Sequence, residues 1–225
     1  MAAVYRLAYG SRSQLFGSFP YAGSPDRRTV ALTFDDGPNE PWTAMILDTL
    51  GERGVPGTFF QVGRCAQRHP EITRRVVDEG HVLGNHSLTH ELGSYWRDVD
   101  QRAEVILGRV ALAEIAGVAP LLYRPPWLCH WPWVLRGIAG TGSQVVSGTF
   151  VHPLEVVQPS VDRLVAGAVR AAAPGAMIII HDGRESVGGF RGRSAAAVGP
   201  MIDALRRRGY DFTTVDRLLG VDAYA

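Results

Sequence analysis

The sequence has no charge excess, no long apolar run and few cysteines. Lys plus Arg number 23 and Asp plus Glu number 22, for a formal net charge of +1. That balance excludes a broad basic surface for binding nucleic acid. No apolar run approaches the roughly 20 residues that a membrane-spanning helix needs. The two cysteines, Cys65 and Cys129, cannot make a disulfide framework and lack metal-ligand spacing to each other. We interpret them as separate thiols, with a single bridge left open.

The 225 residues, 46% of them hydrophobic, are enough for one well-buried core. Residues 1–27 carry scattered Gly, Ser and Pro and are interpreted as an N-terminal lead-in segment, and residues 28–225 as one domain. The first residues show no charged region followed by an apolar one, so no signal peptide is predicted. The compartment stays open: secreted or cell-wall-associated if the chain is a trimmed mature form, and cytoplasmic otherwise.

Short apolar runs alternate with longer stretches of helical spacing. The pattern predicts helices over Trp42–Arg53, Pro70–Glu79, Ser94–Ile115, Val134–Ala139, Ser160–Ala172 and Val198–Arg208. It predicts strands over Thr29–Phe34, Gly57–Val62, His81–Asn85, Leu121–Arg124, Gln144–Gly148, Ala176–His181 and Asp211–Val215. Alternation of this kind indicates an α/β fold, a single-domain distorted (β/α) barrel with about seven parallel strands.

The ends of four of these strands concentrate the reactive side chains, and in such a barrel the strand ends form the active site. In chain order the residues are Asp35, Asp36, Asn85, His86, His90, Arg124, His181 and Asp182. His86 and His90 have the spacing of two metal ligands on one helical turn, which is a weak signal alone. With one carboxylate they make a facial set that suits Zn²⁺, Fe²⁺, Co²⁺ or Ni²⁺.

Asp35 and Asp36 are neighbours, and successive side chains of an extended segment point apart. One of them is therefore expected to bind the metal. The other is expected to face the attacking water, where a carboxylate is a natural general base.

These segments, in this order, resemble the NodB-homology polysaccharide deacetylases, carbohydrate esterase family 4. Three motifs of the family appear as Thr33–Gly37 (TFDDG), His86–His90 (HSLTH) and Arg124–Pro126 (RPP) followed by Trp127. A further motif appears as Ile179–His181, with Ile where Leu is usual. The likeness spans residues 28 to 219, nearly the whole chain.

The resemblance implies a hydrolase of amide bonds with a divalent metal, Zn²⁺ first, with Co²⁺, Ni²⁺ or Fe²⁺ as alternatives. Asp36, His86 and His90 would hold the metal. Asp35 would be the base, Arg124 would orient it, and His181 would protonate the leaving amine. Trp127, through its backbone N–H, and Pro126 are expected at the substrate.

Two departures from the family pattern bear on the substrate. The fourth motif usually ends in Asp-Trp, and here Glu155-Val156 is the nearest pair, so a substituting role for Glu155 is open. The segment after Trp127 is unusually aromatic, and Trp131 and Trp133 either stack on a substrate or pack under a loop. The Gly- and Arg-rich stretch Gly183–Arg193 is expected to be a rim loop. Arg184, Arg191 or Arg193 in it would bind an anionic substrate, with plain solvation as the competing interpretation.

The leading functional hypothesis is removal of an N-linked acetyl group from an N-acetylated amino sugar, in a glycan or a glycoside, giving acetate and a free amine. One alternative is a deacylase of a small non-polymeric N-acyl compound, such as a secondary metabolite or a cyclic amide. Another is a non-catalytic glycan-binding protein. No nucleic-acid partner and no membrane span are expected, and the oligomeric state is left open.

Overall fold

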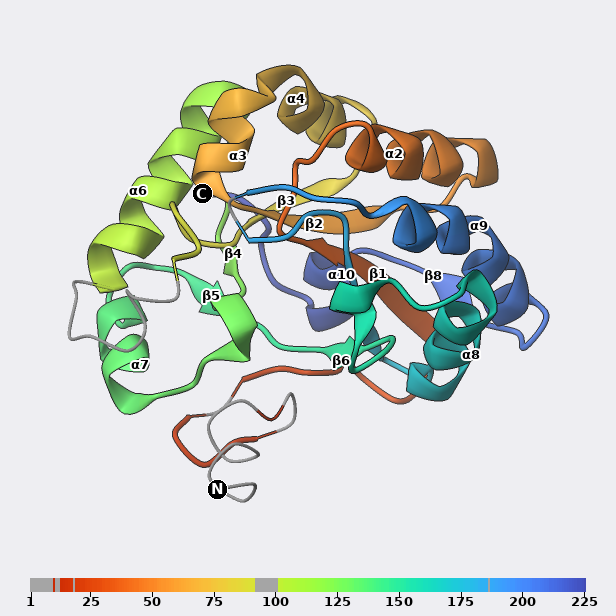
Figure 1. The fold of residues 1–225 in the computed structure, drawn as a ribbon. Coiled ribbons are helices and arrows are strands. Elements are labelled where there is room, and N and C mark those ends of the chain that lie inside the picture. The colour runs from red at the N-terminus through yellow and green to blue at the C-terminus, as the bar shows by residue number, and fades with distance from the viewer. Residues whose placement is uncertain (1–9, 11–12, 18, 92–100, 186) are drawn as a thin grey trace.

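The computed structural model describes residues 10, 13–17, 19–91, 101–185 and 187–225. Through this part of the chain, strands and helices alternate, and the helices pack around one curled sheet (Figure 1). The strands are β1 (Thr29–Asp35), β2 (Gly57–Gln61), β3 (Val82–Asn85), β4 (Leu122–Tyr123), β5 (Gln144–Val145), β6 (Thr149–Phe150), β7 (Met177–His181) and β8 (Asp211–Phe212). The helices are α2 (Trp42–Arg53), α3 (Gly63–Arg68), α4 (Pro70–Asp78), α6 (Gln101–Ala116), α7 (Pro132–Ile138), α8 (Val161–Ala171), α9 (Gly192–Arg206) and α10 (Val215–Leu219), with 3-10 turns η1 (Pro126–Leu128) and η2 (Glu155–Val157).

The sheet is parallel and follows the order β5-β4-β3-β2-β1-β7-β6, with β8 paired to the start of β1. The predicted distorted (β/α) barrel is confirmed. The run predicted as a fifth strand, Gln144–Gly148, contributes the short β5, and β6 follows immediately after it. These two strands are the edges of the main path, so the barrel is open between them.

Side chains of the central strand β1 alternate between two cores. Val30, Leu32 and Phe34 point to the outer core under the helices, where they pack with residues of α2, α8 and α9. Ala31 points to the inner core of the barrel. The period of two therefore turns Asp35 to the inside of the barrel, at the strand end where the chemistry was predicted.

Helix boundaries follow local signals where those signals are strong. The predicted helix Trp42–Arg53 is found with the same limits, and Gly54 ends it with the left-handed φ of 57°. Ser160 caps α8 by accepting a hydrogen bond from the Arg163 N–H, as its sequence position predicted. The helix predicted from Val198 begins earlier, at Gly192, so the rim loop predicted as Gly183–Arg193 is shorter than expected. Positions 94–100 of the predicted helix Ser94–Ile115 lie outside the described residues.

The structure also describes the two cysteines and the apolarity of the helices. Cys65 and Cys129 are free, buried thiols, as interpreted. Among the residues described, no helix combines the length and apolarity required to cross a bilayer. The division into a lead-in segment and a domain stays a prediction, and part of the lead-in packs against the barrel, where Ala22 bridges to Ala176.

Candidate active site

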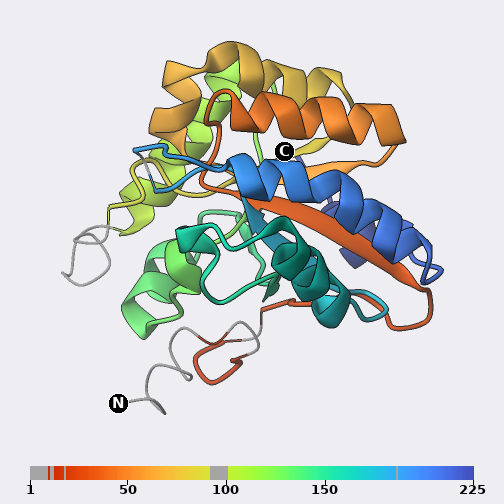
Figure 2. The ribbon, with the colours of Figure 1, turned by 45° about the vertical axis from the view of Figure 1, so that its right-hand side comes forward.

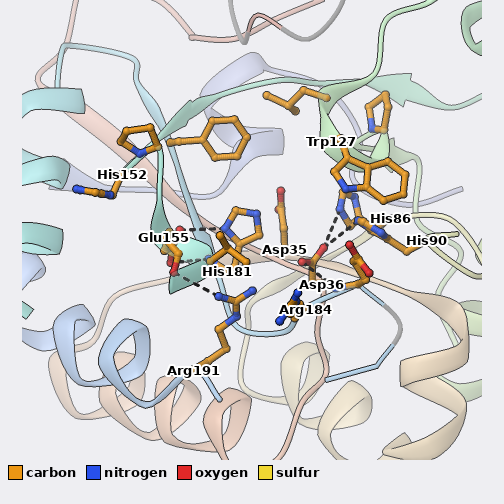
Figure 3. A pocket seen from close by; sticks show the side chains of 16 residues that line it. Asp35, Asp36, His86, His90, Trp127, His152, Glu155, His181, Arg184 and Arg191 are labelled. Carbon is orange, nitrogen blue, oxygen red and sulfur yellow. Dashed lines mark hydrogen bonds and ion pairs between the residues drawn. The ribbon is translucent and has the colours of Figure 1, made fainter. Parts of the chain in front are cut away.

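A cavity of about 420 Å³ opens at the carboxyl ends of the strands. It gathers residues from as far apart in the sequence as Asp35 and Arg191, because parallel strands end on one rim (Figure 3). In Figure 3, Asp35 lies between His181 on one side and the cluster of Asp36, His86 and His90 on the other. The lining residues are Asp35, Asp36, His86, His90, Pro125, Trp127, Leu128, Phe150, His152, Pro153, Glu155, Val156, His181, Arg184, Glu185 and Arg191.

Asp36, His86 and His90 form a tight buried cluster. Asp36 Oδ1 lies 3.3 Å from His86 Nε2 and 3.1 Å from His90 Nε2. Burial opposes ionisation of Asp36, yet the neighbouring His90 and His86 hold its pKa well below the usual range. Asp36 and His90 have left-handed φ values of 76° and 54°. Backbone of that kind costs energy in a non-glycine residue and is characteristic of functional sites.

The orientation of His86 and the donor set of the cluster fit a cation. His86 Nδ1 lies 2.6 Å from the carbonyl oxygen of Arg124. A carbonyl only accepts, so Nδ1 carries a proton and Nε2 is the ring nitrogen that faces Asp36 Oδ1. A histidine held in this way through Nδ1 has Nε2 oriented to bind a metal. One carboxylate and two imidazoles within 4.8 Å of one another are a donor set that fits a divalent transition metal.

The loop that carries His90 is not the helical turn that the spacing of His86 and His90 suggested. Ser87 has a φ of 74°, and its Oγ accepts the His90 N–H at 3.0 Å. Thr89 is tied to Glu104 of α6, which accepts its backbone N–H at 2.9 Å. The two histidines meet through this non-helical loop, which helix periodicity does not describe.

Asp35 turns away from the cluster and pairs with Arg124. Asp35 Oδ1 lies 2.7 Å from Arg124 Nη1. Arg124 has no exposed surface and also donates to Thr33 Oγ1 at 2.8 Å and to the Ser147 carbonyl oxygen at 2.9 Å. Its guanidinium lies over the Phe60 ring, 4.1 Å from the centroid. The two neighbouring carboxylates are thus separated as predicted, one toward the histidines and one toward the arginine.

Glu155 is the partner of His181, which answers the question that the sequence left open. His181 Nδ1 lies 2.9 Å from Glu155 Oε2, and the His181 N–H donates to Glu155 Oε1 at 3.0 Å. Burial by itself would lower the pKa of His181. The Glu155 carboxylate, helped by Asp36 and Asp35, outweighs burial and raises the pKa to about 9. The ring therefore carries a proton at neutral pH, as a general acid must.

A serine completes the surroundings of Glu155 and was not found from the sequence. Ser194 Oγ donates to Glu155 Oε1 at 2.7 Å and accepts from Gln158 Nε2 at 2.9 Å. Ser194 lies in the helix α9, whose start the sequence pattern missed. A Gly-Arg-Ser sequence carries no signal for this role.

Asp182, grouped with His181 at its strand end, does not line the cavity. It is fully buried, and its Oδ2 accepts from Thr43 Oγ1 at 2.7 Å. Burial, reinforced by Asp36 and Asp35, raises its pKa to about 7. Its place behind the glycine that follows Asp36 makes it a packing neighbour of the site.

The tryptophans after Arg124 have two different surroundings: Trp127 lines the cavity, and Trp131 and Trp133 pack away from it. Trp127 lines the cavity and packs edge-on against His90, with ring centroids 4.3 Å apart. Pro126 is buried, and its neighbour Pro125 lines the cavity instead. Trp131 and Trp133 stack on each other at 5.0 Å outside the lining, which favours packing over substrate stacking.

The arginines of the rim loop have different roles. Arg191 is buried and donates to the Gly183 carbonyl oxygen, and Arg193 donates to the Gln158 carbonyl oxygen. These contacts tie both side chains to the chain itself, while Arg191 also lines the cavity. Arg184 is exposed and lines the cavity as well. Binding of an anionic substrate by any of the three arginines stays a prediction.

A (β/α) barrel with acid–base groups and the Asp36–His86–His90 cluster around one rim cavity has the arrangement of an enzyme suited to metal-assisted hydrolysis. Comparison with known proteins makes the class specific. Residues 22–146 match the family model described as polysaccharide deacetylase. The chain belongs to this family, carbohydrate esterase family 4, and is a polysaccharide deacetylase-like hydrolase of carbon–nitrogen (amide) bonds.

Individual relatives agree over nearly the whole chain. The chain is 31% identical to a peptidoglycan-N-acetylglucosamine deacetylase of Bacillus cereus, over 86% of this chain and 89% of the relative. It is 34% identical to a chitooligosaccharide deacetylase of Bradyrhizobium sp., over 88% and 94%. The crystal structure of a peptidoglycan N-acetylglucosamine deacetylase in complex with 4-naphthalen-1-yl-N-oxidanyl-benzamide superposes with a TM-score of 0.84, at 28% identity, over 92% and 95% of the two chains.

Proposed function

We propose that this protein removes an N-linked acetyl group from an N-acetylated amino sugar, releasing acetate and a free amine. The observation that carries the proposal is the position of Asp35 in the cavity, between the cluster of Asp36, His86 and His90 on one side and His181 on the other. The relatives are named as deacetylases of chitooligosaccharides and of N-acetylglucosamine in peptidoglycan. These names favour a glycan over a small N-acyl compound as the substrate.

Asp36, His86 and His90 would hold a divalent cation, with Zn²⁺ as our first expectation. When bound, such a cation supplies Lewis acidity toward a carbonyl oxygen and a water molecule. The chain contributes the remaining steps. Asp35 accepts a proton from the attacking water, and Arg124 orients Asp35 through the contact at 2.7 Å.

His181 donates the second proton. An amine leaves easily only as a neutral molecule, so its nitrogen must receive a proton as the carbon–nitrogen bond breaks. His181 lies on the side of Asp35 opposite the cluster, and Glu155 keeps it protonated. The backbone N–H of Trp127 is proposed to donate to the oxyanion, and the walls of Trp127 and Pro125 to contact the sugar.

The test compares acetate release from N-acetylglucosamine oligomers with release from small N-acyl compounds, using protein of measured metal content. We expect metal-dependent turnover on the oligomers. Asp35→Asn should retain the metal and lose about 10²–10⁴-fold in kcat, the range of general-base catalysis. Turnover confined to small N-acyl compounds would favour the alternative substrate, and absence of all metal-dependent release would refute the proposal.

A further inference from the structure

The chain itself crosses the opening of the barrel. Residues 146–148 connect the edge strands β5 and β6, which do not pair with each other. Ser147 lies in the middle of this crossing and has no exposed surface. Its two backbone polar groups are both hydrogen-bonded, one toward the inside of the barrel and one toward the N-terminal part of the chain.

On the inside, Ser147 fixes the arginine that holds the proposed base. The Ser147 carbonyl oxygen accepts from Arg124 Nη2 at 2.9 Å, while Arg124 Nη1 donates to Asp35 Oδ1 at 2.7 Å. The guanidinium is rigid and planar, so a displaced acceptor on Nη2 rotates the group and disturbs the geometry at Nη1. A fully buried cation also depends on each of its acceptors, because water cannot replace a lost one.

On the outside, Ser147 is held by an N-terminal strap, which we define as residues 19–23. The Ser147 N–H donates to the Pro20 carbonyl oxygen at 2.8 Å. Farther along, Ala22 bridges to Ala176, and the Gly23 N–H donates to the Gly175 carbonyl oxygen at 2.8 Å. Both ribbon views place this segment beneath β6 (Figures 1 and 2).

Phe19 anchors the strap. Its ring is buried and stacks on His130, with centroids 4.6 Å apart and planes 8° apart. Gln14 binds both backbone groups of Phe19, accepting its N–H at 2.6 Å and donating to its carbonyl oxygen at 2.9 Å. The residue before Pro20 is therefore fixed by packing and by hydrogen bonds.

We infer that the N-terminal strap is part of the catalytic unit and that Phe19 is a positioning residue for hydrolysis. The chain of contacts runs from Phe19 and Pro20 through Ser147 to Arg124 and Asp35. The inference rests on the proposed function, because it assigns the strap a role only if Asp35 takes part in the reaction. It extends the catalytic unit into residues that the sequence pattern treated as a lead-in.

The test is Phe19→Ala in the full chain, assayed by acetate release. We expect kcat to fall about tenfold with KM changed less than about twofold, because a misplaced base slows the chemical step without weakening substrate binding. Phe19→Leu, which keeps an apolar anchor, should restore most of the loss. Leu15→Ala changes an exposed side chain just before the strap and should match the wild type.

A second pair of measurements separates positioning from general stability. Val76→Ala removes buried volume in α4, away from the strap, and should lower the melting temperature with kcat unchanged. The NMR signals of the Arg124 guanidinium N–H groups should shift in Phe19→Ala and stay in place in Val76→Ala. Unmoved Arg124 signals with wild-type kcat in Phe19→Ala, or an equal loss of kcat in both variants, would overturn the inference. A wild type that releases no acetate would refute the proposed function, and the NMR comparison would still test the strap.

Discussion

Glu155 controls the proton affinity of His181, and one substitution isolates its charge. Glu155→Gln keeps the size and a hydrogen-bonding group but removes the carboxylate that outweighs burial in setting the His181 pKa of about 9. Without it the effect of burial is opposed only by Asp36 and Asp35, so the ring loses its proton at lower pH. Because activity needs the protonated ring, we expect the alkaline limb of the kcat/KM profile to move down by at least about one pH unit. The profile between pH 6 and 10 measures this, and a limb that stays near pH 9 would contradict the role of Glu155.

His130 makes the stability of the protein depend on pH. It is buried against Phe19 with both ring nitrogens unpartnered, and burial lowers its pKa to about 4. An unfolded chain binds the proton near pH 6.5, so between pH 6.5 and 4 the unfolded state holds more protons and stability falls as the pH falls. The loss reaches at most about 3 kcal/mol.

His130→Phe should abolish that part of the pH dependence, since Phe has a similar flat shape and no proton to take up. Urea unfolding of both proteins at pH 7 and pH 4.5 gives the comparison. We expect the variant to lose less free energy of unfolding than the wild type on acidification. An identical loss in the two proteins would show that His130 does not carry the effect.

Prediction from sequence succeeds at the residue scale where a motif is contiguous. Asp35, Asp36, His86, Arg124 and His181 converge because each is at or next to a strand end, and His90 joins them through the loop that follows β3. The role of Glu155 could not be assigned from the sequence, because its contact with His181 spans 26 positions and depends on the 3-10 turn η2. The carboxylate in the altered fourth motif was its only signal.

At the scale of elements, glycines set how closely helices approach the strands. A Cβ on Gly167 of α8 would overlap the carbonyl oxygen of Val151, just after β6. Gly167→Ala should therefore lower the free energy of unfolding by about 1–3 kcal/mol through overpacking, although alanine is the better helix former. Because Val151 leads into the turn that carries Glu155, kcat should fall as well.

Gly51→Ala in α2 is the matched control. Gly51 is also a helix-interior glycine, but nothing lies within 4 Å of an added Cβ. There the helix propensity acts alone and should stabilise the protein by about 0.5–1 kcal/mol. Chemical unfolding of the two variants measures both changes. Equal stabilisation in both would disprove the close approach at Gly167.

The ends of helices were predictable where the sequence has a residue typical of a helix cap. Gly54 and Ser160 mark the end of α2 and the start of α8, and both signals are correct. The start of α9 was missed because its first residues, Gly192 and Arg193, look like a loop, and the helix is stabilised by burial of its later alanines. Tertiary packing overrides local preference there.

At the scale of the whole molecule, the barrel explains why distant residues meet, and that convergence was predictable from strand and helix alternation. The contact of the strap with Ser147 was not predictable. It joins backbone groups 127 positions apart, and no pattern of side chains indicates it. The predicted boundary between positions 27 and 28 separates segments that are in contact in the folded protein.

A cation bound by Asp36, His86 and His90 would stabilise the whole fold. A ligand that binds only the folded protein stabilises it by RT ln(1 + [L]/Kd), about 2.7 kcal/mol at a hundredfold excess over Kd. We expect added Zn²⁺ to raise the melting temperature of the metal-free protein and a chelator to reverse the rise. Asp36→Ala should lose the response, because two histidines alone make a weak site, whereas Asp35→Asn should keep it, since Asp35 faces Arg124 instead. Differential scanning fluorimetry with and without metal measures all three proteins. A rise that survives Asp36→Ala would place the cation elsewhere and remove the basis for assigning Asp35 and His181 to the two sides of a metal-dependent reaction.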